Sequence, residues 1–291
     1  MKRRFASSGG ELAYVDEGDG PAVVLLHGFP TSSHLWRQFV PPLAARHRVI
    51  APDLLGYGDS AKPPASDLSI AAQAGVVLEL LAHCGVEEFA AIGHDVGGGV
   101  AQLLALDGGA NATAKALVLL DSIAFDVWPI EGVRMLQATS AAQETAELVE
   151  DLVRLSLDLG MGKKERRTDE LVGAYAAPFL EDPGAFFRAA RAVDGRGLAD
   201  REEELAALDV PVFLLWGEDD PYLPVEVADR LNELLPGSTL ALLPGCSHFV
   251  TEDATETIVP LVSEWLRVQY LHAPHAHDHE RPLIQLQRPN A

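Results

Sequence analysis

The chain has 291 residues, of which 48% are hydrophobic, and this is enough for a large core in a single α/β domain with an insertion. Its formal net charge of −21 argues against nucleic acid or an anionic membrane as a partner. The two cysteines, Cys84 and Cys246, offer neither a disulfide framework nor the spacing of a metal site. No apolar run resembles a signal peptide or approaches the ~20 residues of a membrane span, so we expect a soluble, cytoplasmic protein.

Short apolar segments alternate with helical stretches along most of the chain. Residues 12–16 and 22–26 flank a turn-rich connector, and this pattern predicts a hairpin or a close pairing of the two. Further β-like runs end at residues 51, 92, 120, 216 and 243, and helical stretches cover 68–83 and 97–107. Apolar strands that alternate with helices are typical of a parallel sheet covered on both faces.

The alternation stops after Asp121. Residues 127–207 contain no convincing strand, and glycines and prolines divide them into several helices. We therefore expect a core formed by residues 1–121 and 208–271, with a helical cap, residues 122–207, over the carboxyl edge of the sheet. The core is expected to end in an amphipathic helix over 252–270.

The last twenty residues, 272–291, carry His275, His277 and His279 in alternation. Three imidazoles can bind a metal, but no second ligand cluster at fixed spacing accompanies them. A disordered polar tail is the preferred interpretation, and no metal is expected.

The segment Gly93-His94-Asp95-Val96-Gly97-Gly98 has the pattern of a nucleophile elbow, because it follows an apolar strand and leads into a helix. Asp95 stands where a serine is usual. With a reference pKa of ~3.9 it is already an anion at neutral pH, and a carboxylate suits displacement at a saturated carbon that leaves an alkyl ester on the enzyme. The alternative role, an N-cap of the following helix, weakens once partner residues are found in order.

Such partners follow in the order nucleophile, acid, histidine. Gly217-Glu218-Asp219-Asp220 comes after the strand that ends at Trp216, and His248 lies in the loop after the strand that ends at Leu243. Because open α/β sheets place ligand sites at the carboxyl ends of their strands, these loops are expected to converge on Asp95.

Taken together, these motifs resemble the α/β-hydrolase family, within it the branch of epoxide hydrolases and haloalkane or haloacetate dehalogenases with an aspartate nucleophile. The resemblance covers most of residues 10–270. It implies a mostly parallel eight-stranded sheet flanked by helices, with a helical cap inserted after the sixth strand. The matching segments are His27-Gly28-Phe29-Pro30, Asp53 to Ser60, the elbow, Gly217 to Asp220, and His248.

The resemblance also implies roles for single residues. Asp95 would be the nucleophile, His248 the base that activates water, and Asp220 the acid that orients the histidine. Asp219 competes with Asp220, since the register of a loop is uncertain by one residue. Some relatives place the acid after the preceding strand, where this chain has Asp121.

The main-chain N–H groups of Phe29 and Val96 would form the oxyanion hole. No cofactor is implied, because nothing resembles a nucleotide-binding loop. The expected partner is a small-molecule substrate; a homodimer stays open.

The leaving group decides between several activities. Dehalogenases commonly place a tryptophan directly after the nucleophile, or arginines close behind it, and Val96 matches neither. Epoxide hydrolases commonly use two cap tyrosines, of which this chain has one, Tyr175. An epoxide hydrolase is therefore preferred, followed by a dehalogenase, an esterase or lactonase, and a non-catalytic binding protein.

Four side chains are candidates for the substrate pocket. Tyr175 would assist an alkoxide leaving group, and the indole N–H of Trp128 would meet a halide. His34 and Trp36 follow the segment His27-Gly28-Phe29-Pro30, here called the oxyanion loop, and are expected to line the pocket.

Overall fold

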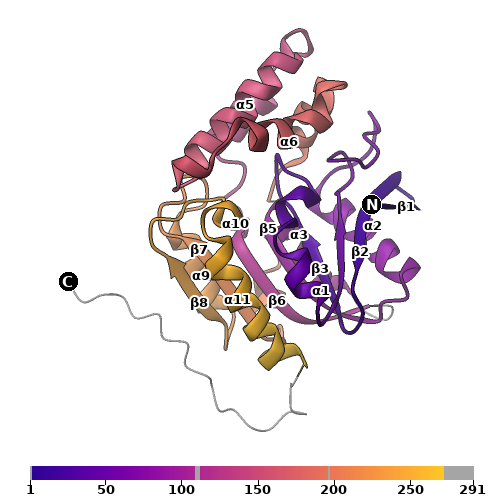
Figure 1. Cartoon of the computed structure of the whole chain (residues 1–291), viewed down its shortest axis with the longest axis vertical. Coiled ribbons are helices and arrows are strands. Elements are labelled where there is room, and N and C mark those ends of the chain that lie inside the picture. The colour runs from indigo at the N-terminus through magenta and orange to yellow at the C-terminus, as the bar shows by residue number, and fades with distance from the viewer. Residues whose placement is uncertain (1, 109–111, 196, 272–291) are drawn as a thin grey trace, which may run out of the picture.

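A mostly parallel sheet of eight strands forms the centre of the molecule, and this confirms the fold predicted from the sequence (Figure 1). The computed structural model describes residues 2–108, 112–195 and 197–271. The strand order is β1-β2-β4-β3-β5-β6-β7-β8, and only β1 and β2 run antiparallel to their neighbours. The strands are β1 (Arg3–Ala6), β2 (Glu11–Glu17), β3 (Ala22–Leu26), β4 (Arg48–Pro52), β5 (Glu88–Asp95), β6 (Thr113–Ser122), β7 (Val212–Gly217) and β8 (Thr239–Leu243).

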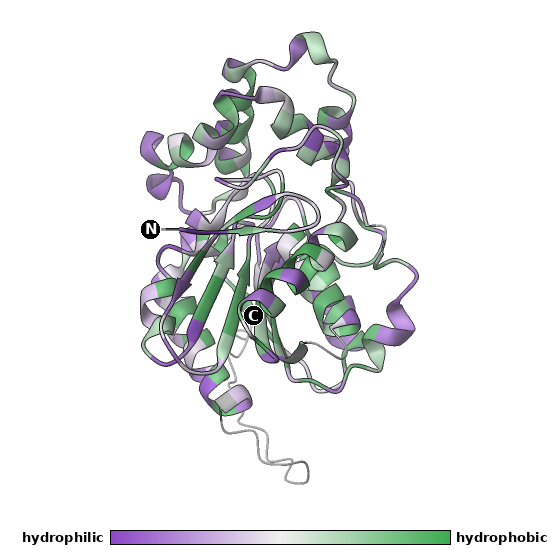
Figure 2. Ribbon diagram, turned by 90° about the vertical axis from the view of Figure 1, so that its right-hand side faces the viewer, coloured by the Kyte–Doolittle hydropathy of each residue, from purple (hydrophilic) through white to green (hydrophobic). Residues whose placement is uncertain are grey.

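The central strands are apolar on both faces because helices flank the sheet on both sides (Figure 2). Every residue of β3 and β7 is buried, and so are all but the first residue of β5. The helices of the core are α1 (Val40–Ala44), α2 (Ile70–His83), α3 (Val96–Asp107), α9 (Val225–Leu234), α10 (Val250–Asp253) and α11 (Thr255–Leu266), with a short 3-10 helix at Ser33–Trp36.

The segment between β6 and β7, here called the helical insertion, interrupts the alternation of strands and helices. Its described residues contain no strand. In Figure 1 its helices α5 and α6 lie above the sheet, on the side where the core strands lead into their loops. The helices are α4 (Glu131–Gln137), α5 (Ala146–Gly160), α6 (Asp169–Leu180), α7 (Pro183–Ala192) and α8 (Glu202–Ala206), with short 3-10 turns at Ala141–Gln143 and Lys164–Arg166.

The hairpin predicted from residues 12–16 and 22–26 is wrong. β4 lies between β2 and β3, antiparallel to the first and parallel to the second. The turn-rich connector therefore carries the chain past a strand that comes later in the sequence. A turn signal is local, and it cannot reveal that a later strand takes the position between its two neighbours.

The terminal helix predicted over 252–270 is interrupted. Its first turn is α10, and Ala254, with φ −137° and ψ 31°, separates it from α11. A single π-helical turn, Arg267–Leu271, completes the described chain. The predicted disordered tail, with His275, His277 and His279, lies outside the described residues. Within the described ranges, no helix has the length and apolar character needed to cross a membrane.

Candidate active site

Asp95 lies at a sharp turn between β5 and α3. Its φ of 53° and ψ of −120° are unusual for a residue with a side chain, and this side chain does not cap the helix. The turn needs glycines around it, because a Cβ on Gly97 would lie 2.1 Å from the Leu26 carbonyl oxygen and one on Gly93 would lie 2.3 Å from that of Gly97. The strand-to-helix elbow predicted from the sequence is therefore present in the backbone.

The Asp95 carboxylate is buried and held by main-chain donors. Its Oδ1 accepts the Phe29 N–H at 2.8 Å, and the Val96 N–H also bonds to it. A Cβ on Gly28 would lie 2.3 Å from the same oxygen, so the loop approaches this closely only as glycine. Burial raises the pKa of Asp95 to about 6, although the charge of His248 and the two N–H groups act to lower it.

His248 connects Asp95 to a second carboxylate. Its Nε2 lies 3.9 Å from Asp95 Oδ2, and its Nδ1 donates to Asp220 Oδ2 at 2.9 Å. Asp220 is fixed in turn, because its Oδ1 accepts the N–H groups of Tyr222 and Leu223 at 2.8 and 3.0 Å. Burial acts to lower the pKa of His248, but the charge and hydrogen bond of Asp220 and the charge of Asp95 together raise it above its usual value.

Asp219 and Asp121, the two alternatives to Asp220 as the acid that orients His248, are placed differently from Asp220. Asp219 is exposed. Asp121, at the end of β6, is buried, and its Oδ1 accepts the Gly217 N–H at 2.8 Å, so it supports the start of the loop that carries Asp220. Burial and the charge of Asp220 raise the pKa of Asp121 well above its usual range.

Two buried histidines support the loops of the site. His94 donates through Nε2 to the His248 carbonyl oxygen at 2.9 Å, and burial holds its pKa well below the usual value. His27 contacts the Gly28 carbonyl oxygen through Nδ1 at 3.0 Å and accepts the Leu54 N–H at Nε2, while burial lowers its pKa to about 4. Both are therefore neutral positioning groups.

A cavity of about 140 Å³ lies against Asp95 and His248. The core contributes loop residues to its wall, and the helical insertion contributes mostly aliphatic ones. The lining residues are Phe29, Pro30, Asp95, Trp128, Ile130, Gly132, Val133, Leu136, Leu152, Leu155, Ser156, Leu159, Phe186, Tyr222 and His248.

Of the four predicted pocket side chains, the structure places only Trp128 in this lining. Its indole Nε1 is buried without a hydrogen-bond partner among the described residues. Tyr175 is buried elsewhere and donates its hydroxyl to Glu252 Oε1 at 2.6 Å, and His34 packs edge-on against it. Trp36 is fully buried against Phe39.

Tyr222 is a lining residue that the sequence analysis missed. Its ring packs edge-on against His248 at a centroid distance of 5.0 Å, and its hydroxyl donates to the Ser156 carbonyl oxygen in α5 at 3.0 Å. Burial raises its pKa to about 12, so the phenol keeps its proton at neutral pH. Tyr222 comes two residues after Asp220, in a loop at the carboxyl end of a strand, and this position could have predicted that it lies at the site.

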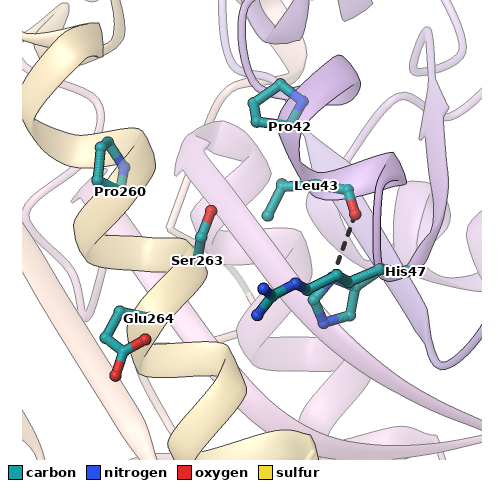
Figure 3. A pocket seen from close by; sticks show the side chains of 7 residues that line it. Pro42, Leu43, His47, Pro260, Ser263 and Glu264 are labelled. Atoms are coloured by element: carbon teal, nitrogen blue, oxygen red, sulfur yellow. Dashed lines mark hydrogen bonds between the residues drawn. The ribbon is translucent and has the colours of Figure 1, made fainter.

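A second, separate hollow lies between α1 and α11 (Figure 3). It has a volume of about 240 Å³, and none of the site residues lines it. Within it the His47 Nδ1 bonds to the Leu43 carbonyl oxygen at 3.2 Å, and Glu264 on the opposite helix pairs with Arg267.

Comparison with known proteins places this geometry in context. The profile of the alpha/beta hydrolase fold family matches residues 21–255. Haloalkane dehalogenase 2 of Mycobacterium tuberculosis is 30% identical, with 90% of this chain and 93% of that protein covered. A soluble epoxide hydrolase of Corynebacterium sp. is 29% identical over 87% of this chain and 92% of its own. The crystal structure of an alpha/beta hydrolase fold protein from Burkholderia ambifaria superposes with a TM-score of 0.82 at 34% identity, covering 89% of this chain and 96% of that one.

Proposed function

The chain belongs to the α/β-hydrolase family and is a hydrolase, and from this premise we propose that it hydrolyses a bond at a saturated carbon through a covalent ester of Asp95. The support is the combination of an elbow carboxylate, a base within reach and a cavity beside both. Asp95 Oδ2 is the nucleophile, because Oδ1 is engaged by Phe29 while Oδ2 has no partner among the described residues.

In the first half-reaction, Asp95 Oδ2 forms a bond to the substrate carbon as the leaving group departs with the bonding electrons. In the second, a water between His248 Nε2 and the ester gives a proton to His248 and attacks the ester carbonyl. The N–H groups of Phe29 and Val96 then stabilise the oxyanion, a role in which one donor is typically worth ~3 kcal/mol of barrier. Collapse releases the product alcohol with a proton from His248 and leaves Asp95 as a carboxylic acid. This acid then loses the second proton of the water to solvent, which restores the carboxylate.

The leaving group is a halide in our first proposal, and one observation carries it. Trp128 lines the cavity, and its buried indole N–H has no hydrogen-bond partner among the described residues, so a leaving anion that reached this donor would satisfy it. The phenol on which the epoxide prediction rested, that of Tyr175, is engaged by Glu252 instead. Haloalkane hydrolysis therefore ranks before epoxide hydrolysis, which reverses the order expected from the sequence.

Epoxide opening is the second candidate, because Tyr222 brings a protonated phenol to the same cavity. An alkoxide leaving group needs such a proton, and a halide does not. To serve this reaction the Tyr222 hydroxyl would have to exchange its bond to Ser156 for one to the substrate oxygen.

We also propose that residues 122–207 are a cap domain on a core of residues 1–121 and 208–271. The support is that α4, α5 and α7 of the helical insertion contribute side chains to the cavity beside Asp95. In this arrangement the core supplies the reacting groups, and the cap supplies the apolar wall that selects the substrate.

The first test traps the intermediate. We expect His248→Gln to lose turnover and to gain the mass of one alkyl group on Asp95 when it is incubated with 1-bromobutane, because alkylation needs no base and hydrolysis does. Intact mass and peptide mapping measure it, with His248→Gln/Asp95→Asn as the control that cannot be alkylated. Absence of the adduct with every halide, epoxide and ester offered would refute the covalent scheme.

The second test separates the leaving groups. Trp128→Phe removes the indole donor and keeps an aromatic ring, and we expect kcat/KM for bromide release to fall about 10- to 100-fold, the effect of one hydrogen bond to a charged group. Trp36→Phe is the matched control, since its buried indole N–H also has no hydrogen-bond partner in the part of the chain that the structure describes, and Trp36 does not line the cavity. Diol formation from styrene oxide without halide release from any haloalkane would favour the epoxide candidate.

A further inference from the structure

Helix α5 has two apolar sides, and only one is needed for packing. Val149, Val153 and Leu157 are buried, and the helix packs against α6 and α7. A second row, Leu152, Leu155 and Leu159, follows the helical spacing on another face and lines the cavity beside Asp95. The second row therefore belongs to the binding site.

Two residues of this second row are half-exposed although they line the cavity. Leu155 is 51% exposed and Leu159 is 52% exposed. They lie one helical turn apart, so they form a continuous apolar strip from the cavity wall to the surface. The cavity therefore opens over these two leucines.

The size and charge of the cavity restrict what it can hold. Its volume of about 140 Å³ lies below the ~300–1,000 Å³ of pockets that enclose a drug-sized ligand. No lysine or arginine is among its lining residues in the described chain, so a carboxylate or phosphate on the substrate would find only His248, which already faces the carboxylates of Asp95 and Asp220. The reactive end of the substrate is thus small and uncharged.

We propose that the substrate is an uncharged, unbranched alkyl compound. Its electrophilic terminal carbon reaches Asp95, and its chain leaves the cavity along Leu155 and Leu159. This inference rests on the proposed function and adds the substrate class. The occupant of the strip is the substrate itself, because the strip is continuous with the cavity that contains Asp95 and His248.

The test is a chain-length series of 1-bromoalkanes from ethyl to octyl, with the matching 1,2-epoxyalkanes in parallel. Each methylene that reaches the strip should raise kcat/KM about fourfold, which corresponds to ~0.8 kcal/mol per buried CH₂. In Leu155→Asn/Leu159→Asn the ratio of kcat/KM for the octyl and ethyl substrates should fall by at least tenfold. Folding of this variant is checked by its circular dichroism and, with His248→Gln added, by adduct formation with bromoethane.

Met135 supplies the matched control, because it is 68% exposed on α4 and does not line the cavity. Met135→Asn should leave the slope of the series unchanged. Three results would overturn the inference while the adduct test still supports the proposed function. They are a kcat/KM that does not change with chain length in the wild-type protein, an equal fall of the octyl-to-ethyl ratio in Met135→Asn, and a dimer in light scattering that both variants dissociate. Failure of the adduct test overturns both.

Discussion

Asp95 has to be an anion to attack carbon, yet its surroundings disfavour the charge. The side chain is 1% exposed, and burial raises its pKa to about 6, well above the reference value used in the sequence analysis. Alkylation is therefore expected to increase as the pH rises through about 6. A less hydrated carboxylate is also the better nucleophile, so the burial that costs ionisation supports the reaction.

The two half-reactions should separate with pH. Hydrolysis of the ester needs neutral His248, whose pKa is raised, so it requires a higher pH than a free histidine would. Esterification removes the charge of Asp95 and with it one of the causes that raise this pKa, which leaves Asp220 as the main one. We expect rapid-quench mass spectrometry with 1-bromobutane to find more ester at pH 6.5 than at pH 9. An ester fraction that grows with pH would contradict this assignment of the base.

How far single residues could be predicted depends on how local their signal is. Asp95, His248 and Asp220 follow motifs at strand ends, and the structure brings these three side chains together. Trp128 lies near the start of the helical insertion and Tyr222 in the core loop after β7, and both line the same cavity. Tyr175 looked like their equal in sequence, but its direction depends on how α6 packs, which no local pattern encodes.

At the scale of elements, Glu252 joins three parts of the chain. On α10 it accepts two hydrogen bonds from Arg37, both at 2.7 Å, and one from the Tyr175 hydroxyl of α6. Arg37 directly follows the 3-10 helix after the oxyanion loop. The cluster therefore links the helical insertion to the core beside the site and outside the cavity.

Tyr175→Phe should weaken this link without changing catalysis. Removing the hydroxyl is expected to lower the free energy of unfolding by about 1.5–3 kcal/mol, the typical contribution of one hydrogen bond to a charged group, while kcat/KM stays as in the wild type. Urea denaturation and halide release measure the two effects. Tyr222→Phe is the matched variant. It also loses one hydroxyl hydrogen bond, here to the Ser156 carbonyl oxygen, but Tyr222 lines the cavity. Loss of turnover in Tyr175→Phe would restore this residue as a leaving-group donor.

Strands and helices could be placed from the sequence where a continuous apolar run is interrupted by turn residues, as for β5 and α3 on either side of the elbow. Their neighbours in the sheet could not. The separation of β2 from β3 by β4 depends on long-range pairing. The break at Ala254 was missed for a similar reason: Asp253 turns back to accept the N–H groups of Ser247 and Gly162, a contact made only in the folded chain.

Across the whole molecule, the sheet acts as a rigid support for loops that come from distant parts of the sequence. Phe29 follows β3, Asp95 ends β5, Asp220 follows β7 and His248 follows β8. In the parallel part of the sheet, β3 is next to β5, β6 alone separates β5 from β7, and β7 is next to β8, so their carboxyl ends bring the four residues to one edge. Precision at the site therefore depends on the stability of the whole sheet.

That stability should respond to salt because of the net charge of −21. Like charges on a compact surface repel each other, and salt screens this repulsion, with a Debye length of about 10 Å at 0.1 M. Exposed ion pairs such as Arg267–Glu264 weaken as well, but their contribution is small in water. We expect Tm at pH 7.5 to rise between 10 and 300 mM NaCl, by about 2–4 °C for each kcal/mol of repulsion relieved. At pH 5 the rise should be smaller, because protonated carboxyls and charged histidines reduce the net charge. A fall in Tm with salt at pH 7.5 would mean that attractive pairs outweigh the overall repulsion.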